Sequence, residues 1–95
     1  MNSVEKIVTL ENKLGLHLRA AVIFVQAATK FQSVIKVKKV NNSGSGWRNG
    51  KSILSVGTLD AGKGSQIIIN ARGEDAIEAV EKLTKLFEDK FGEKE

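Results

Sequence analysis

Residues 15–31 read GLHLRAAVIFVQAATKF and contain the clearest structural signal in the chain. Small or aromatic apolar residues recur every three or four positions from Ala20 to Phe31, whereas Gln26 and Lys30 fall on the opposite side. This spacing predicts an amphipathic helix of about a dozen residues with a small, alanine-rich buried face. The segments around it have a different period and therefore form other elements.

Two of these segments, residues 4–10 and 34–40, alternate between apolar and polar residues, which is the pattern of half-buried strands. We expect strands at residues 4–10, 34–40 and 66–71. A loop rich in glycine and asparagine, residues 41–50, carries Trp47. This composition predicts a flexible hairpin with a short strand on its far side.

Two more helices are expected in the second half of the chain. Ser52 is a suitable N-cap for a short helix at residues 52–59. Gly73 precedes a long amphipathic helix, predicted at residues 74–91 with acids in its first turns. Its expected core stripe is Ala76, Val80, Leu83, Phe87 and Phe91. The order β-α-β-β-α-β-α in a single domain, residues 1–95, predicts an α+β two-layer fold with helices on one side of a sheet.

The 95 residues carry a formal net charge of +4 and contain no cysteine. Disulfides and thiolate chemistry are therefore excluded. A zinc site is nearly excluded as well, because the chain offers one histidine and no cysteine as ligands. The charge is uneven, with eleven bases against three acids in residues 1–73 and four against eight in residues 74–95. Neither a membrane-spanning stretch nor a signal-peptide core is visible, so we expect a cytoplasmic protein with no membrane insertion.

The lone histidine, His17, stands where the first helix is expected to begin. A helix start presents unpaired backbone N–H groups and the positive end of the helix dipole, which favour an anion. Arg19 adds a permanent positive charge two residues later. A ring nitrogen beside an anion site is what a phosphohistidine intermediate needs. The spacing alone also fits a histidine that only caps the helix or packs under a loop.

Two other functional interpretations are weaker. Gly50-Lys51-Ser52 is not a phosphate-binding loop, because Gly46 leaves three intervening residues and Gly44 leaves five, where four are required. Lysines on the strand at residues 34–40 permit a nucleic-acid interface, but the strands lack paired aromatic residues for base stacking. We therefore expect no nucleic-acid partner.

Residues 12–21, NKLGLHLRAA, together with residues 49–54, NGKSIL, resemble the HPr family. These are the histidine-containing phosphocarrier proteins of the bacterial phosphoenolpyruvate-dependent sugar phosphotransferase system. The resemblance implies an open-faced β-sandwich with a four-stranded antiparallel sheet and three helices on one face. It implies that His17 accepts a phosphoryl group on Nδ1 from enzyme I and passes it to an enzyme IIA domain. Arg19 would help to hold the phosphate.

In this interpretation the chain is a monomeric phosphoryl carrier rather than a free-standing enzyme, and it needs no cofactor and no metal. Ser52 matches the family's regulatory serine, which an HPr kinase/phosphorylase modifies in some bacteria. A transcriptional regulator is a further expected partner. We assign the partner-binding surface to Leu16, Leu18, Ala20, Lys51, Ile53 and Leu54. Lys51 and Arg19 are the basic residues expected nearest to His17.

Three features depart from the family pattern. Leu18 stands where Ala or Thr is usual, and Ala20 replaces a proline that would preset the first helical turn. The loop at residues 41–49 is longer than the usual hairpin. Two alternatives therefore stay open. One is a regulatory binding module with a vestigial His17, and the other is a nitrogen-related phosphorelay paralogue that does not drive sugar transport.

Overall fold

Four strands and three helices follow one another in the expected order, and a short 3₁₀ turn comes after them. The computed structural model describes residues 2–40 and 46–95, so part of the predicted long loop lies outside the described residues. The elements are β1 (Ser3–Thr9), α1 (Leu18–Ala28), β2 (Val34–Lys39), β3 (Arg48–Asn49), α2 (Ile53–Gly57), β4 (Gln66–Arg72), α3 (Ala76–Glu88) and the turn Lys90–Gly92.

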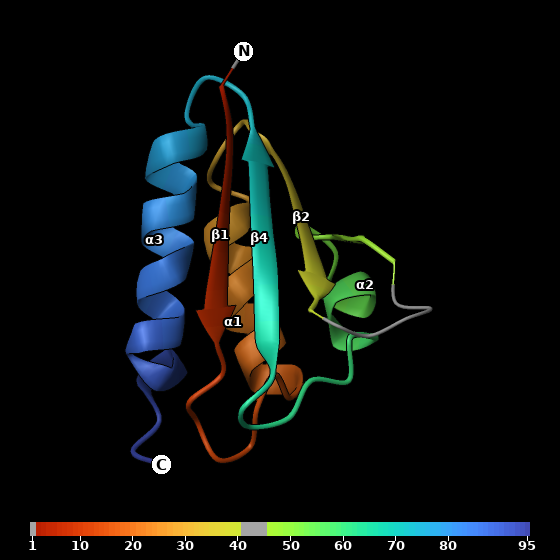
Figure 1. The fold of residues 1–95 in the computed structure, drawn as a ribbon, viewed down its shortest axis with the longest axis vertical. Helices are drawn as coiled ribbons and strands as arrows, with labels where there is room; N and C mark the ends of the chain where they lie inside the picture. The colour runs from red at the N-terminus through yellow and green to blue at the C-terminus, as the bar shows by residue number, and fades with distance from the viewer. Residues whose placement is uncertain (1, 41–45) are drawn as a thin grey trace.

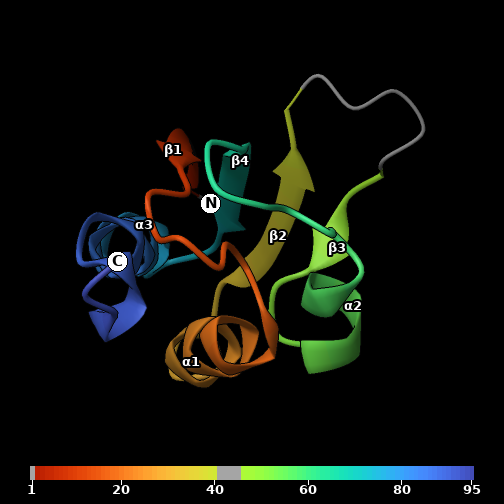
Figure 2. The same cartoon turned by 90° about the horizontal axis from the view of Figure 1, so that it is seen from below.

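The strands form one antiparallel sheet in the order β1-β4-β2-β3. Strand β4 lies in the interior of the sheet, where Ile68 is opposite Ile7 of β1 and Ile69 is opposite Val37 of β2. All three helices lie on the same side of this sheet (Figure 1, Figure 2). The open-faced α+β sandwich is therefore confirmed.

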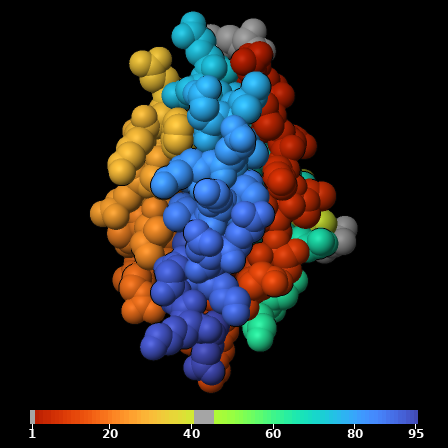
Figure 3. All heavy atoms as spheres, turned by 90° about the vertical axis from the view of Figure 1, so that its left-hand side faces the viewer, coloured from red at the N-terminus to blue at the C-terminus, as the bar shows by residue number. Residues whose placement is uncertain are grey.

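The core fills the space between the sheet and the helices. Ile67, Ile69 and Ala71 of β4 point inward and are completely buried. Helix α1 faces them with its alanine-rich stripe, and Phe24 of α1 meets Phe87 of α3 edge to face at 6.1 Å between ring centroids. Helix α3 fills the surface between α1 and β1 (Figure 3). The small side chains of α1 thus allow the two helices to share one hydrophobic layer.

The last helix is shorter than residues 74–91, because the chain leaves the helical conformation before Phe91. Lys90 and Phe91 have left-handed backbone angles, with φ of 53° and 54°. Such angles cost about 1–2 kcal/mol for each non-glycine residue. Burial of Phe91 against Phe87, at 5.0 Å between ring centroids, offsets that cost. The predicted core stripe is confirmed, and the tail turns toward the end of the molecule where α1 begins (Figure 1).

Asp75, just before α3, ties this helix to the start of β2. Its carboxylate accepts hydrogen bonds from the backbone N–H groups of Gln32 and Ser33, at 2.8 and 2.9 Å, and from the Ser33 hydroxyl. The hydroxyl bond is the main reason why the pKa of Asp75 lies below its ordinary value, and the Gln32 N–H is the next. The sequence patterns related this acid only to the helix dipole, so they missed the link.

Asp75→Asn is expected to lower the free energy of unfolding at neutral pH, because the neutral amide is a weaker acceptor for these donors. Since the folded-state pKa of Asp75 is depressed, its stabilising effect is fully present above the ordinary aspartate value of about 3.9 and is lost as the pH falls through the folded value. Urea unfolding midpoints of wild type and variant should therefore converge in acid. A constant difference from pH 7 to pH 2 would contradict this. Glu74→Gln is the matched control, with little change expected.

Candidate functional site

His17 is the N-cap residue of α1, which confirms the expected helix start. Its side chain makes no capping hydrogen bond, so the first backbone N–H groups of the helix remain available to another acceptor. Gly15, two residues earlier, has a φ of +65°. A Cβ at Gly15 would lie 2.5 Å from the carbonyl oxygen of Ala61, so only glycine allows the loop before His17 to pass this close to the neighbouring backbone.

A carboxylate from the C-terminal tail lies against the imidazole of His17. Glu93 Oε2 is hydrogen-bonded to His17 Nε2, and the ring nitrogen is the donor because an ionised carboxylate can only accept. Glu93 Oε1 accepts a second bond, 3.0 Å long, from the amide of Asn12. The bond from His17 and then the bond from Asn12 lower the pKa of Glu93, which is therefore ionised at neutral pH. The sequence patterns missed Glu93 because it lies far from His17 along the chain.

Arg19 stands beside this pair with most of its side chain in solvent. Its Nη2 lies 3.5 Å from Glu93 Oε2, and 65% of the side chain is exposed. A guanidinium group has five N–H donors, so this one long contact leaves it able to bind a phosphate. The structure thus brings His17 and Arg19 together, as the sequence predicted, and adds Glu93 to them.

The predicted partner-binding residues divide into two groups. Leu18 and Leu54 are 72% and 84% exposed, and Ile53 is also exposed. Leu16 and Ala20, by contrast, are buried core residues. Their assignment to a contact surface is wrong in this structure, because the helix period that made Ala20 part of the buried stripe also removes it from solvent.

In the segment around Ser52, the side chain of Lys51 is directed away from His17. Ser52 is the N-cap of α2, and its hydroxyl accepts a 3.2 Å bond from the N–H of Ser55, which confirms the predicted cap. Lys51 Nζ donates to the carbonyl oxygen of Phe31, which follows the C-terminal end of α1, at 2.6 Å. The expectation that Lys51 lies close to His17 is therefore wrong, because its ammonium group binds at the opposite end of the helix.

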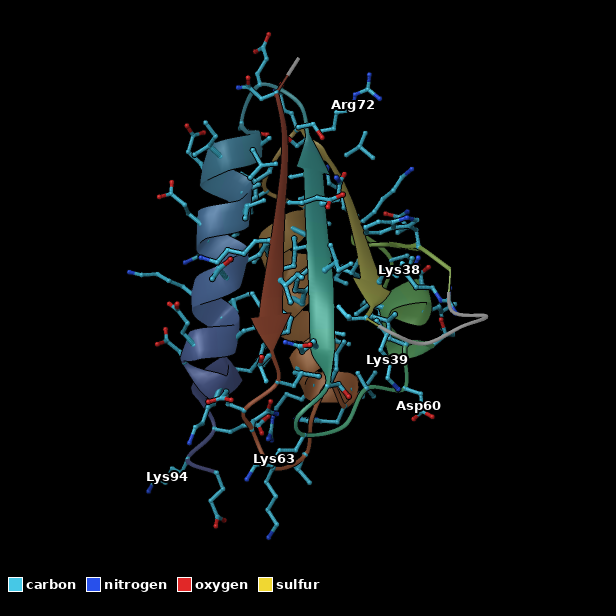
Figure 4. The ribbon with its side chains drawn as sticks, viewed as in Figure 1. Lys38, Lys39, Asp60, Lys63, Arg72 and Lys94 are labelled. Atoms are coloured by element: carbon cyan, nitrogen blue, oxygen red, sulfur yellow. The ribbon has the colours of Figure 1, made fainter. Side chains whose placement is uncertain are left out.

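Four further basic residues come from β2, from β4 and from the loop before β4. Arg72 and Lys63 lie at opposite ends of the sheet, while Lys39 lies next to Asp60, to whose carbonyl oxygen it donates a 3.0 Å bond (Figure 4). Lys38 lies over the Trp47 ring, 5.7 Å from its centroid. Lys39, Lys63 and Arg72 therefore do not converge on one site, whereas Lys13 lies with Arg19 and Glu93 around one pocket.

Residues 2–40 and 46–95 contain neither a cluster of metal ligands nor a membrane-spanning helix. In these ranges no group of three or more histidine and carboxylate side chains is arranged to hold a metal ion. No helix in the same ranges is long and apolar enough to cross a bilayer. The side chains gathered at His17 are the Glu93 carboxylate, the Arg19 guanidinium and the Asn12 amide behind the carboxylate.

An open-faced β-sandwich that presents a histidine at the start of its first helix defines the class of HPr-like domains. The family model for the PTS HPr component phosphorylation site matches residues 4–89. The chain therefore belongs to the HPr family, the phosphocarrier proteins of the phosphotransferase system.

Individual relatives agree with this assignment. The chain is 43% identical over 84 residues to the phosphocarrier protein HPr of Neisseria meningitidis serogroup A, which covers 88% of this chain and 90% of the relative. It is 39% identical to HPr of Pseudomonas aeruginosa, over 93% and 94% of the two chains. The crystal structure of HPr-C-His from Thermoanaerobacter tengcongensis matches with a TM-score of 0.87 and 40% identity, over 97% and 99% of the chains. Both the sequence and the fold are thus similar to HPr along nearly the whole chain.

Proposed function

We propose that His17 accepts a phosphoryl group from phosphorylated enzyme I and passes it to an enzyme IIA domain, in the cytoplasm. The observation that supports this most is the placement of the imidazole at the start of α1, with Nε2 bonded to Glu93. A ring whose Nε2 carries the proton has its lone pair on Nδ1. Nδ1 is therefore the nucleophile.

The transfer exchanges one phosphorus–nitrogen bond for another. The lone pair of His17 Nδ1 forms a bond to phosphorus, and the electron pair of the breaking bond returns to the nitrogen of the donor's phosphohistidine. The unpaired N–H groups of the first turn of α1 and the Arg19 guanidinium stabilise the charge on the phosphoryl oxygens. Positioning and charge stabilisation supply the catalysis, so the carrier itself needs no metal or nucleotide.

Three exposed apolar residues can contact both protein partners. Leu18 follows the phosphorylated residue directly, and Ile53 and Leu54 form the exposed first turn of α2. Contiguous exposed apolar patches often mark protein–protein contact sites, and Ile53 and Leu54 are adjacent exposed residues. We assign Leu18, Ile53 and Leu54 to the surface that meets enzyme I and then enzyme IIA.

The test is phosphorylation of the purified chain with phosphoenolpyruvate, Mg²⁺ and enzyme I from a related bacterium. Intact-mass spectrometry is expected to detect the addition of one phosphoryl group that is lost in acid and retained in base, as a phosphorus–nitrogen bond requires. Addition of an enzyme IIA domain is then expected to remove it. An acid-stable phosphate, or none, contradicts the proposal.

We also propose that phosphorylation of Ser52 regulates the carrier. A phosphate on the N-cap hydroxyl would add about two negative charges beside Ile53 and Leu54. Negative charge is favourable at the N-terminus of a helix, so α2 tolerates the phosphate. An apolar docking surface, by contrast, binds its partner less tightly when a charged group is placed in it. Phosphorylation at Ser52 would thus weaken the binding of enzyme I without unfolding α2.

Ser52→Asp is expected to raise the KM for the carrier in the enzyme I reaction about tenfold, equivalent to about 1.4 kcal/mol of binding. The control is Ser52→Asn, because Asp and Asn are equally good N-caps and differ here in charge. Steady-state rates at varied carrier concentration measure the effect. Equal KM values for the two variants would remove the charge-based mechanism.

A further inference from the structure

The C-terminal tail that carries Glu93 lies beyond residues 4–89, which match the family model. Three consecutive residues with positive φ, Lys90, Phe91 and Gly92, turn the chain back after α3. Phe91 anchors this turn in the core. Two of these residues are not glycine, and backbone strain of this kind persists only where the surrounding structure determines it. The tail is therefore folded into a defined position next to His17.

Asn12 fixes the orientation of the Glu93 carboxylate from behind. Its side chain is completely buried, and its amide nitrogen donates both to Glu93 Oε1 and to the carbonyl oxygen of Gly15, at 3.0 and 2.7 Å. A buried amide is costly unless it is hydrogen-bonded. These two bonds link the tail to the loop that precedes His17. As a result Oε2, the other carboxylate oxygen, is directed at the imidazole.

We propose that Glu93 is a positioning residue for His17, holding the proton on Nε2 and balancing the positive charge that the ring acquires when Nδ1 binds phosphorus. The proposal rests on the proposed phosphorylation of His17. Only 12% of the Glu93 side chain is exposed, so a partner protein has little access to it. Glu93 therefore acts through the ring and not through docking.

Each transfer leaves the Nε2 proton in place. When the Nδ1 lone pair forms the bond to phosphorus, the ring becomes a phosphorylated imidazolium whose charge is opposed by the Glu93 carboxylate. When the next partner takes the phosphoryl group, the electron pair of the Nδ1–phosphorus bond returns to Nδ1 and the ring is again neutral. A carboxylate held on the distal ring nitrogen stabilises an imidazolium in the same way in hydrolase triads. No proton has to be exchanged with solvent in either direction.

The hydrogen bond is tested on the unphosphorylated protein by NMR of ¹⁵N-histidine-labelled samples at pH 8.5. The wild type is expected to contain only the Nε2–H tautomer, with a slowly exchanging N–H proton. Glu93→Ala is expected to contain both tautomers and to lose that proton signal to exchange. Glu95→Gln, which removes one carboxylate from the same tail, is the matched control and is expected to resemble the wild type. A wild-type signal in Glu93→Ala overturns the proposal.

The effect on transfer is tested with two donors, phospho-enzyme I and the small donor phosphoramidate. Glu93→Ala is expected to lower the maximal rate about tenfold with both donors, without changing the KM for the carrier; losing the carboxylate behind a metal-bound histidine has an effect of that order. Glu93→Asp is expected to recover part of that rate, and Glu95→Gln to keep all of it. An unchanged rate in Glu93→Ala overturns the proposal, even if the NMR spectrum shows a change in the tautomer of the His17 ring.

The two tests separate this proposal from the proposed function. If no donor phosphorylates the wild type, the phosphocarrier function of His17 fails, and the NMR experiment still decides whether Glu93 fixes the tautomer. If the wild type and Glu93→Ala are phosphorylated equally fast, the function stands and the role of Glu93 is refuted.

Discussion

His17→Ala is expected to take up no acid-labile phosphate at all. His17 is the one histidine in the chain, so its removal eliminates the imidazole nitrogen on which a phosphorus–nitrogen bond can form. Phosphoryl transfer from enzyme I should fall to the background of a reaction without carrier, measured by intact mass after incubation with phosphoenolpyruvate.

A matched variant shows whether this loss is chemical. His17→Asn keeps a good N-cap residue at the start of α1 but has no nucleophilic ring. We expect it to fold like the wild type by circular dichroism and to be equally inactive. Acid-labile phosphate on either variant would mean that another residue is the acceptor.

Gly15→Ala is expected to cause the largest loss of stability among single-methyl additions near the site. The new Cβ would lie 2.5 Å from the carbonyl oxygen of Ala61 and 2.7 Å from the Cα of Gly62, both of them backbone atoms that cannot rotate away. Left-handed strain of about 1–2 kcal/mol and overpacking of about 1–3 kcal/mol together predict a loss of about 2–5 kcal/mol. That is a large fraction of the 5–15 kcal/mol typical of a domain. Urea unfolding at pH 7 measures it.

Gly64→Ala separates the two contributions to this loss. Gly64 also has a positive φ, +90°, but a Cβ there would meet no atom within 4 Å. We therefore expect only the strain, a loss of about 1–2 kcal/mol. Equal losses in the two variants would show that the close approach of Gly15 to the neighbouring loop contributes nothing.

Local patterns were sufficient for most of the fold. The three-to-four spacing after His17 predicted α1, alternation predicted β2, and the residue type of Ser52 predicted the N-cap of α2. Each of these depends on neighbours within a few residues, where periodicity and capping preferences apply. The same patterns placed α3 correctly but extended it to Phe91.

The features that could not be predicted all depend on contacts between distant parts of the chain. The turn after α3 brings Glu93 to Asn12 and His17, which lie far from it along the chain. The link from Asp75 to Ser33 and the bond from His17 to Glu93 join residues that only the folded chain brings together.

The candidate site was therefore predicted in part. His17 and Arg19 follow from their place at a helix start, where the chemistry of an anion site is local. Glu93 and Asn12, which fix the ring from the other side, needed the tertiary structure. Of the predicted contact residues, the structure leaves Leu18, Ile53 and Leu54 exposed and buries Leu16 and Ala20.

The most direct measurement is ³¹P and ¹⁵N NMR of the wild-type chain after reaction with phosphoenolpyruvate, Mg²⁺ and enzyme I. The account predicts one phosphoryl group per chain, with phosphorus–nitrogen coupling to Nδ1 of His17, and loss of that signal when an enzyme IIA domain is added. Phosphorus bound to an oxygen atom, or no phosphorylation of His17, would contradict it.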